Sequence, residues 1–117
     1  MLGLVVFEAA RGTSPVTDYI EAQDAPTRAR LIEAVQSFCE EFPWVVSVDV
    51  KQIRGKLWEM RVRDGSGRQH RLLYAVAGSD VLVVHAFLKK KRRAPPVEIR
   101  TAERRLRTML PAARGRR

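Results

Sequence analysis

The sequence predicts an α+β fold in which helices pack against one small antiparallel sheet, in the order β-α-α-β-β-β-α. Three runs rich in β-branched and aromatic residues follow one another in the second half, separated by the turn sequences DGSG and AGSD. Two other segments place apolar residues at helical spacing. With 117 residues, 45% of them hydrophobic, the chain can bury one core, so residues 1–117 are expected to form a single domain.

The chain is expected to open with a strand at residues 2–7, LGLVVF. A secretory signal is disfavoured because no Lys or Arg precedes this run and acidic Glu8 follows at once. Residues 14–22 then predict a short helix, in which Ser14 is the N-cap and Pro15 takes the first helical position. The first two elements are therefore a strand and a helix.

A longer amphipathic helix is expected over residues 25–42, with Asp24 as its N-cap and Pro43 ending it. The apolar residues that line one face are spaced by four, three and four: Leu31, Val35, Phe38 and Phe42. Cys39, the lone cysteine, cannot form an internal disulfide and is expected to be a small buried hydrophobe in a reducing cytoplasm. These helices are expected to pack on the sheet.

The second half predicts a three-stranded antiparallel meander over residues 57–63, 69–76 and 81–88. A basic helix follows over residues 97–110, because apolar side chains recur there at helical spacing while four Arg fill its polar side. Residues 114–117 are expected to be a frayed basic tail.

Positive charge is concentrated at the C-terminal end. From Lys89 to Arg117 there are 12 Lys and Arg and two Glu, a net charge of +10, whereas the first 88 residues carry −1. Residues 89–93, KKKRR, begin where the last strand ends and lead towards the Arg-rich helix. Such a run is commonly a solvated linker, but cations fixed at a strand end indicate a site for a phosphate backbone.

Several kinds of site are disfavoured. One Cys and two distant His give no zinc pattern, and the sparse carboxylates of the second half do not resemble a two-metal nuclease. No dinucleotide-binding or Walker glycine motif occurs, so neither a metal nor a cofactor is expected. No apolar run approaches the roughly 20 residues of a membrane span, so no membrane partner is expected.

The strand at residues 57–63 has two contrasting faces. One face is expected in the core and consists of Trp58, Met60 and Val62. The opposite face carries charge and consists of Leu57, Glu59, Arg61 and Arg63. The simpler interpretation of the second face is a solvated surface with weak ion pairs. On that interpretation the arginines have no catalytic role.

Arg71 is harder to place on a surface, because it lies in RLLY within a strongly apolar strand. A buried Arg needs a buried carboxylate such as Glu59, or an anionic ligand. A four-residue loop would pair Arg61 with His70, whereas a bulged turn would pair it with Arg71, and both registers remain open. His70, like His85 in the last strand, is either a hydrogen-bonded core residue or a proton donor or acceptor.

Residues 53–106 resemble the RelE/ParE superfamily of toxins, in particular the HigB-like branch that includes phage Gp49-type proteins. The ordered set LWEMR, RLLY, HAFLKK and a C-terminal helix after the prolines carries this resemblance. It implies a RelE-like fold and a cytoplasmic toxin of a type II toxin–antitoxin system, silenced by an antitoxin of the helix-turn-helix kind. The implied activity is ribosome-dependent cleavage of mRNA by attack of the ribose 2′-hydroxyl, without a metal.

The resemblance also implies site residues. The cations that match catalytic or phosphate-binding positions are Arg61, Arg71, Lys89 and Lys90, and the further RNA-binding residues are Lys56, Lys91, Arg92 and Arg93. KKKRR is more basic than the usual pattern of the family, which implies stronger contact with ribosomal RNA. The resemblance assigns no general base; His85 and Tyr74 are candidates only.

Two other functions compete with the endoribonuclease. A ParE-like toxin that poisons gyrase would share the fold without cutting RNA, and a non-catalytic basic RNA-binding domain would need no convergent site. A cluster of fixed cations in one hollow favours the nuclease. Cations spread over opposite surfaces would favour the RNA-binding domain.

Overall fold

The computed structural model describes residues 1–90, 92 and 95–114, with the backbone alone for 111–114. The elements in chain order are β1 (Gly3–Val6), α1 (Pro15–Glu21), α2 (Ala25–Glu41), β2 (Asp49–Arg54), β3 (Leu57–Arg63), β4 (Gln69–Ala77), β5 (Asp80–Lys89) and α3 (Pro96–Arg114). The α+β class is confirmed, and the caps of the first two helices are as expected. Ser14 Oγ accepts from the Thr17 N–H and Asp24 Oδ1 accepts from the Thr27 N–H.

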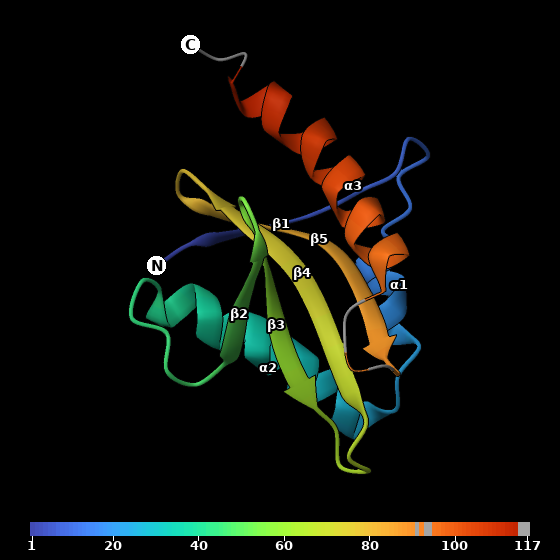
Figure 1. The fold of residues 1–117 in the computed structure, drawn as a ribbon. Coiled ribbons are helices and arrows are strands. Elements are labelled where there is room, and N and C mark those ends of the chain that lie inside the picture. The colour runs from blue at the N-terminus through green and yellow to red at the C-terminus, as the bar shows by residue number, and fades with distance from the viewer. Residues whose placement is uncertain (91, 93–94, 115–117) are drawn as a thin grey trace.

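A single five-stranded sheet has the order β1-β5-β4-β3-β2 (Figure 1). β2, β3, β4 and β5 are antiparallel neighbours, whereas β1 pairs in parallel with β5. The sheet was expected to be antiparallel throughout, and the parallel pairing of β1 with β5 departs from that expectation. Strand β2 was not predicted. Its sequence DVKQIR has only two apolar residues, since the strand lies at an edge of the sheet.

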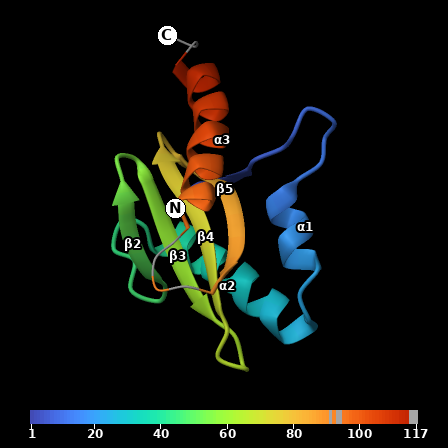
Figure 2. The same ribbon diagram turned by 45° about the vertical axis from the view of Figure 1, so that its right-hand side comes forward.

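Helices cover both faces of the sheet. α2 lies behind it and α3 in front, as Figure 2 shows from a second direction. One core lies between the sheet and the N-terminal helices, around Leu31, Met60 and Leu72, none of which is exposed. A second core joins the other face to α3 through Leu73, Ala102 and their neighbours.

The second core overturns one expectation about β3. The face that carries Leu57 and Glu59 is not a solvated surface, since α3 covers it and both residues are buried. Trp58, expected in the core, is 36% exposed at the rim of a groove. Cys39 is buried and free, as expected. α3 extends past the predicted end to Arg114; residues 115–117 of the expected tail lie outside the described residues.

Among the described residues, the structure has no helix that is both long and apolar enough to cross a membrane.

Candidate functional site

The turn between β3 and β4 decides which side chains face each other. Residues 64–68 connect the strands, and Asp64 Oδ1 accepts hydrogen bonds from the N–H groups of Ser66 and Arg68, at 2.9 and 3.0 Å. Gly67 takes a φ of +88°, a conformation that favours glycine. This turn pairs Arg61 with Arg71, so the second of the two registers is confirmed. Paired residues lie on one face of a sheet, and both arginines therefore lie on the α3 face.

Arg61 is held from the side by Asp49, the first residue of β2. Its Nη2 donates to Asp49 Oδ1 at 3.0 Å, and its Nε lies 3.0 Å from Oδ2. The hydrogen bond that Arg61 donates to Asp49 raises the pKa of Arg61. The side chain stays about one-third exposed. The Nη2 bond is the side-chain hydrogen bond that Arg61 makes within the described part of the chain; Nε is buried without a hydrogen-bond partner there, and Nη1 is unbonded as well.

Arg71 is buried, with only 3% of its surface exposed. Nη2 donates to Gln69 Oε1 at 2.9 Å and Nη1 to the carbonyl oxygen of His70 at 3.3 Å. Nε lies 3.5 Å from Oε1 of buried Glu59, the carboxylate that the sequence suggested as its partner. This Nε has no hydrogen-bond partner among the residues that the structure describes. Burial lowers the pKa of Arg71, and the Glu59 carboxylate opposes that shift.

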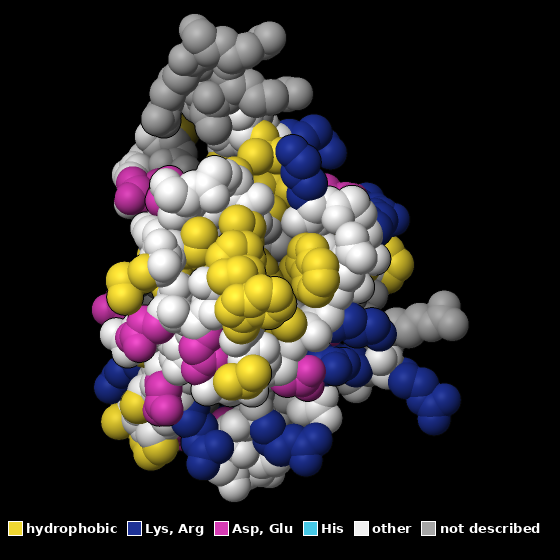
Figure 3. All heavy atoms as spheres, turned by 90° about the vertical axis from the view of Figure 1, so that its left-hand side faces the viewer, with side chains coloured by type: hydrophobic (Ala, Val, Ile, Leu, Met, Phe, Trp, Pro, Cys, Tyr) yellow, Lys and Arg dark blue, Asp and Glu magenta, His cyan; other side chains and the backbone are white. Residues whose placement is uncertain are grey.

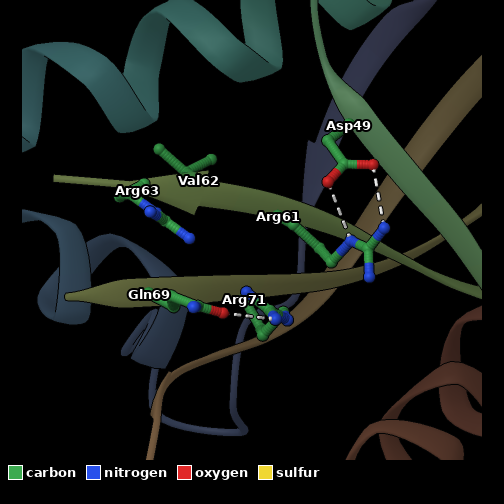
Figure 4. Close-up of a pocket in the computed structure, with 6 residues that line it drawn as sticks. All are labelled: Asp49, Arg61, Val62, Arg63, Gln69 and Arg71. Atoms are coloured by element: carbon green, nitrogen blue, oxygen red, sulfur yellow. Dashed lines mark hydrogen bonds and ion pairs between the residues drawn. The ribbon is translucent and has the colours of Figure 1, made fainter. Parts of the chain in front are cut away.

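The two arginines line a hollow of about 250 Å³, here called the arginine hollow (Figure 4). Its lining residues are Asp49, Arg61, Val62, Arg63, Gln69 and Arg71. Figure 4 shows Arg61 and Arg71 next to each other on adjacent strands, with Arg63 extending towards Gln69. Three guanidinium groups from two strands thus surround one small space, where they can stabilise an anion.

A second hollow, of about 460 Å³, adjoins the first and is here called the lysine hollow. Its lining residues are Gly67, Arg68, Gln69, Leu88, Lys89, Lys90 and Arg92. Gln69 lines both hollows and lies opposite Lys89 in the β4–β5 pairing. The structure therefore places Arg61 and Arg71 in one hollow and Lys89 and Lys90 in another, and the two hollows share Gln69 as a lining residue. Lys91 and Arg93 lie outside the described residues.

Arg68 in the turn is a cation that the sequence interpretation missed. Asp64 Oδ2 accepts from Arg68 Nε at 2.9 Å and also from His70 Nε2 at 2.9 Å. His70 is 1% exposed, and its Nδ1 lies 2.7 Å from the Tyr19 hydroxyl. The hydrogen bond from His70 holds the pKa of Asp64 well below its usual range, and burial raises the pKa of Tyr19 to about 12. His70 is thus a hydrogen-bonded core residue, and the chain of contacts fixes Arg68 at the rim of the lysine hollow.

His85 is held away from the two hollows. Its Nδ1 accepts from Arg105 Nη1 at 3.1 Å, so its Nε2 carries the proton and donates to Glu98 Oε1 at 2.6 Å. Burial lowers the pKa of His85. Tyr74 is buried against α2 on the other face, and burial raises its pKa. Neither candidate base lines the arginine or the lysine hollow.

Lys56 is not brought together with the other cations. It lines an apolar groove of about 550 Å³ on the α2 side of the sheet, with Trp58 and Phe42. Figure 3 shows hydrophobic side chains gathered on this side of the molecule. Trp44, in the loop between α2 and β2, is 83% exposed.

Within the described residues, no three His, Cys, Asp or Glu side chains are grouped closely enough to hold a metal ion.

The structure is thus an α+β domain whose sheet carries two neighbouring cationic hollows. Residues 18–107 match the family described as phage-derived protein Gp49-like (DUF891), which is well over half of the chain. The chain therefore belongs to the Gp49-like family, a toxin-like family of the RelE/HigB-related group, and its architecture is consistent with a RelE-like fold. No curated protein matches the chain.

Three charged residues of the hollows were not predicted as site residues: Arg63, which was placed only on the charged face of its strand, Asp49 and Arg68. Asp49 lies on strand β2, which was not predicted, and Arg68 lies in a sequence that indicates only a turn. A cation placed directly before a predicted strand, as in GRQH, is the one signal that could have identified Arg68. Nothing local in the sequence identifies Asp49, because it reaches Arg61 only through the pairing of β2 with β3.

Proposed function

We propose that this chain is the toxin of a type II toxin–antitoxin pair, of the HigB-like branch, and that it cuts mRNA on the ribosome. The observation that carries the proposal is the convergence of Arg61, Arg63 and Arg71 on one hollow that opens beside Lys89 and Lys90. A protein that only binds another protein has no need of such a convergent cation site. The membership in a toxin-like family supports the same conclusion.

The reaction proposed is an internal transfer within RNA. The 2′-oxygen of one ribose forms a bond to the adjacent phosphorus while the bond from phosphorus to the 5′-oxygen of the next nucleotide breaks. The products are a 2′,3′-cyclic phosphate and a free 5′-hydroxyl, and the proton of the 2′-hydroxyl is balanced by the proton gained at the leaving oxygen. The phosphorus centre gains negative charge on the way, so fixed positive groups accelerate the step.

Each arginine contributes differently to that stabilisation. Asp49 engages the Nε and Nη2 side of Arg61, which orients the guanidinium and leaves Nη1 for a phosphate oxygen. Arg71 lies deeper, with Glu59 beside it, and supplies a fixed positive charge at the floor of the hollow. Lys89 and Lys90 in the lysine hollow would hold the phosphates of neighbouring nucleotides.

The proposal includes the partners and the place of action. A cognate antitoxin, of the helix-turn-helix kind, would silence the toxin, and the ribosome would present the mRNA in the cytoplasm. The high positive charge, +9 over the whole chain, suits a surface built of RNA phosphates.

The test is cleavage of mRNA by the purified protein on translating ribosomes, followed by mapping of the cut ends and identification of the terminal phosphate. Arg61→Ala should lower the rate by about 100-fold, the size of effect seen when one preorganised donor is removed. Arg104→Ala, which removes an exposed Arg of α3 outside both hollows, should leave the rate unchanged.

Expression of the protein in growing cells separates the alternatives. Intact mRNA together with broken DNA would indicate a gyrase poison. Binding of RNA without any cut would leave only a basic RNA-binding domain.

A further inference from the structure

A third hollow, here called the α2 hollow, continues the arginine hollow around the edge of the sheet. It has a volume of about 500 Å³ and shares Asp49, Arg61, Val62 and Arg63 with the arginine hollow. The reason for this continuity is the short strand β2, which begins at Asp49 opposite Arg61. Beyond that pair, Val62 and Arg63 have no neighbouring strand on the β2 side among the described residues, so the surface passes from the α3 face towards α2.

The side chains that belong to the α2 hollow alone differ in charge from those of the other two. They combine one cation, one carboxylate and two hydroxyls: Arg30, Glu33, Ser37 and Ser47. The α2 hollow adds one cation of its own, Arg30, and the Glu33 carboxylate offsets that charge, so a second phosphate site does not fit here. The hollow instead suits a nucleobase. Its hydrogen-bond donors and acceptors can contact the edge of the base, and the apolar side chains of Ala34 and Val48 can contact its face.

Two of these groups are held in place by contacts of their own. Arg30 Nη1 donates to the carbonyl oxygen of Arg63 at 3.2 Å. The Ser47 hydroxyl donates to a carboxylate oxygen of Glu41, whose other oxygen accepts from the Ser47 N–H at 2.8 Å. These hydrogen bonds lower the pKa of Glu41. Because the Ser47 hydroxyl proton is donated to Glu41, the Ser47 oxygen can only accept a hydrogen bond from a ligand. The hollow therefore favours a ligand with a hydrogen-bond donor next to Ser47.

We propose that the α2 hollow binds the nucleobase of the nucleotide next to the cleaved phosphate and so sets the sequence preference of the toxin. The inference rests on the proposed function, since it gives a specificity site to the same RNA. Glu33 and Ser37, one helical turn apart on α2, would read the base edge, with the Glu33 carboxylate accepting from an exocyclic amino group. The phosphate of this nucleotide would lie in the arginine hollow, across the shared side chains.

The test uses the full-length protein, translating ribosomes and an mRNA with a randomised window. Sequencing of the cut ends gives the relative frequency of the four bases at each position beside the cut. This ratio does not depend on how much RNA is cut, so a change in total activity does not disturb it. The variants are Glu33→Gln and Ser37→Ala, and Glu40→Gln, on the same helix but outside the hollow, is the matched control.

The wild type is expected to prefer one base with an amino group at a single position next to the cut. Glu33→Gln should reduce that preference by about tenfold, the effect of one good contact to a base edge, and the control should retain it. If the wild type cuts with no base preference, or if both variants keep the wild-type preference, the α2 hollow is not a base site and only this inference fails. If the wild type cuts no RNA at all, the proposed function fails and this inference fails with it.

Discussion

The ion pair between Arg71 and Glu59 allows the structural and catalytic roles of Arg71 to be separated. Both side chains are at least 93% buried, and Arg71 Nε lies 3.5 Å from Glu59 Oε1. Replacing Arg71 by Met keeps much of the side-chain volume but leaves the Glu59 carboxylate buried without its partner. We therefore expect Arg71→Met to lower the free energy of unfolding, even before any effect on cleavage.

The magnitude follows from the distance and the burial. Two unit charges 3.5 Å apart attract by about 5 kcal/mol at an effective dielectric constant of 20. Removing one member of a buried pair typically destabilises by about 3–5 kcal/mol. The Glu59 carboxylate also acts on Arg61, which would compensate part of the loss, so we expect about 3 kcal/mol. The double variant Arg71→Met, Glu59→Gln has no uncompensated charge and should lie within about 1–2 kcal/mol of the wild type.

The assay is urea unfolding of the wild type, both single variants and the double variant, followed by ribosome-dependent cleavage with the same samples. Arg63→Met, at an exposed Arg of the same hollow, is the control for stability and should change it by less than about 0.5 kcal/mol. The double variant should fold and yet fail to cut. A loss below about 1 kcal/mol for Arg71→Met, or a double variant no more stable than the single ones, would refute the reasoning about the buried pair.

Three further outcomes test other parts of the structure. Lys89→Ala combined with Lys90→Ala should reduce the salt dependence of RNA binding by about two charges, which filter binding at several salt concentrations measures, and an unchanged slope would exclude contact with phosphates. Because the pKa of Asp64 is depressed in the folded protein, its contribution to stability is present above the ordinary carboxyl pKa and is lost as the pH falls below it. Asp64→Asn should therefore abolish part of the acid-induced loss of stability in urea unfolding; parallel pH profiles would contradict this. Ser14→Ala should lower the free energy of unfolding by about 1 kcal/mol through loss of the N-cap on α1, as measured by thermal unfolding. Thr13→Ala, at the neighbouring position, is the control, and an equal loss in both variants would contradict the role of the cap.

Much of the fold could be predicted because its signals are local. The spacing of Leu31, Val35 and Phe38 identified α2, and two turn sequences identified the β3–β4–β5 meander. Strand β2 was missed because an edge strand with few apolar residues has no clear periodicity, and its partner strand defines it. The burial of Glu59 on the α3 face of the sheet was likewise missed, since an alternating strand pattern does not show whether a helix covers that face.

The candidate site was predicted only in its composition. The residue types pointed to Arg61, Arg71 and the lysines at the end of β5, but the hollow that joins the two arginines depends on one register of the hairpin. A shift by one residue would have placed Arg61 opposite His70 and turned the arginines to different faces. The sequence could not distinguish these registers, because the bulged turn is selected by the contacts of Asp64 within the folded hairpin.

By itself, the sequence determined the class of fold, the identity of most helices and strands, and the concentration of positive charge near the C-terminus, because each follows from the spacing and type of neighbouring residues. Only the tertiary structure decided that Arg71 is buried against Glu59, that Asp49 orients Arg61, and that the hollows adjoin one another. These contacts join residues from different strands and helices, and their geometry is set by strand register and by packing of the whole chain.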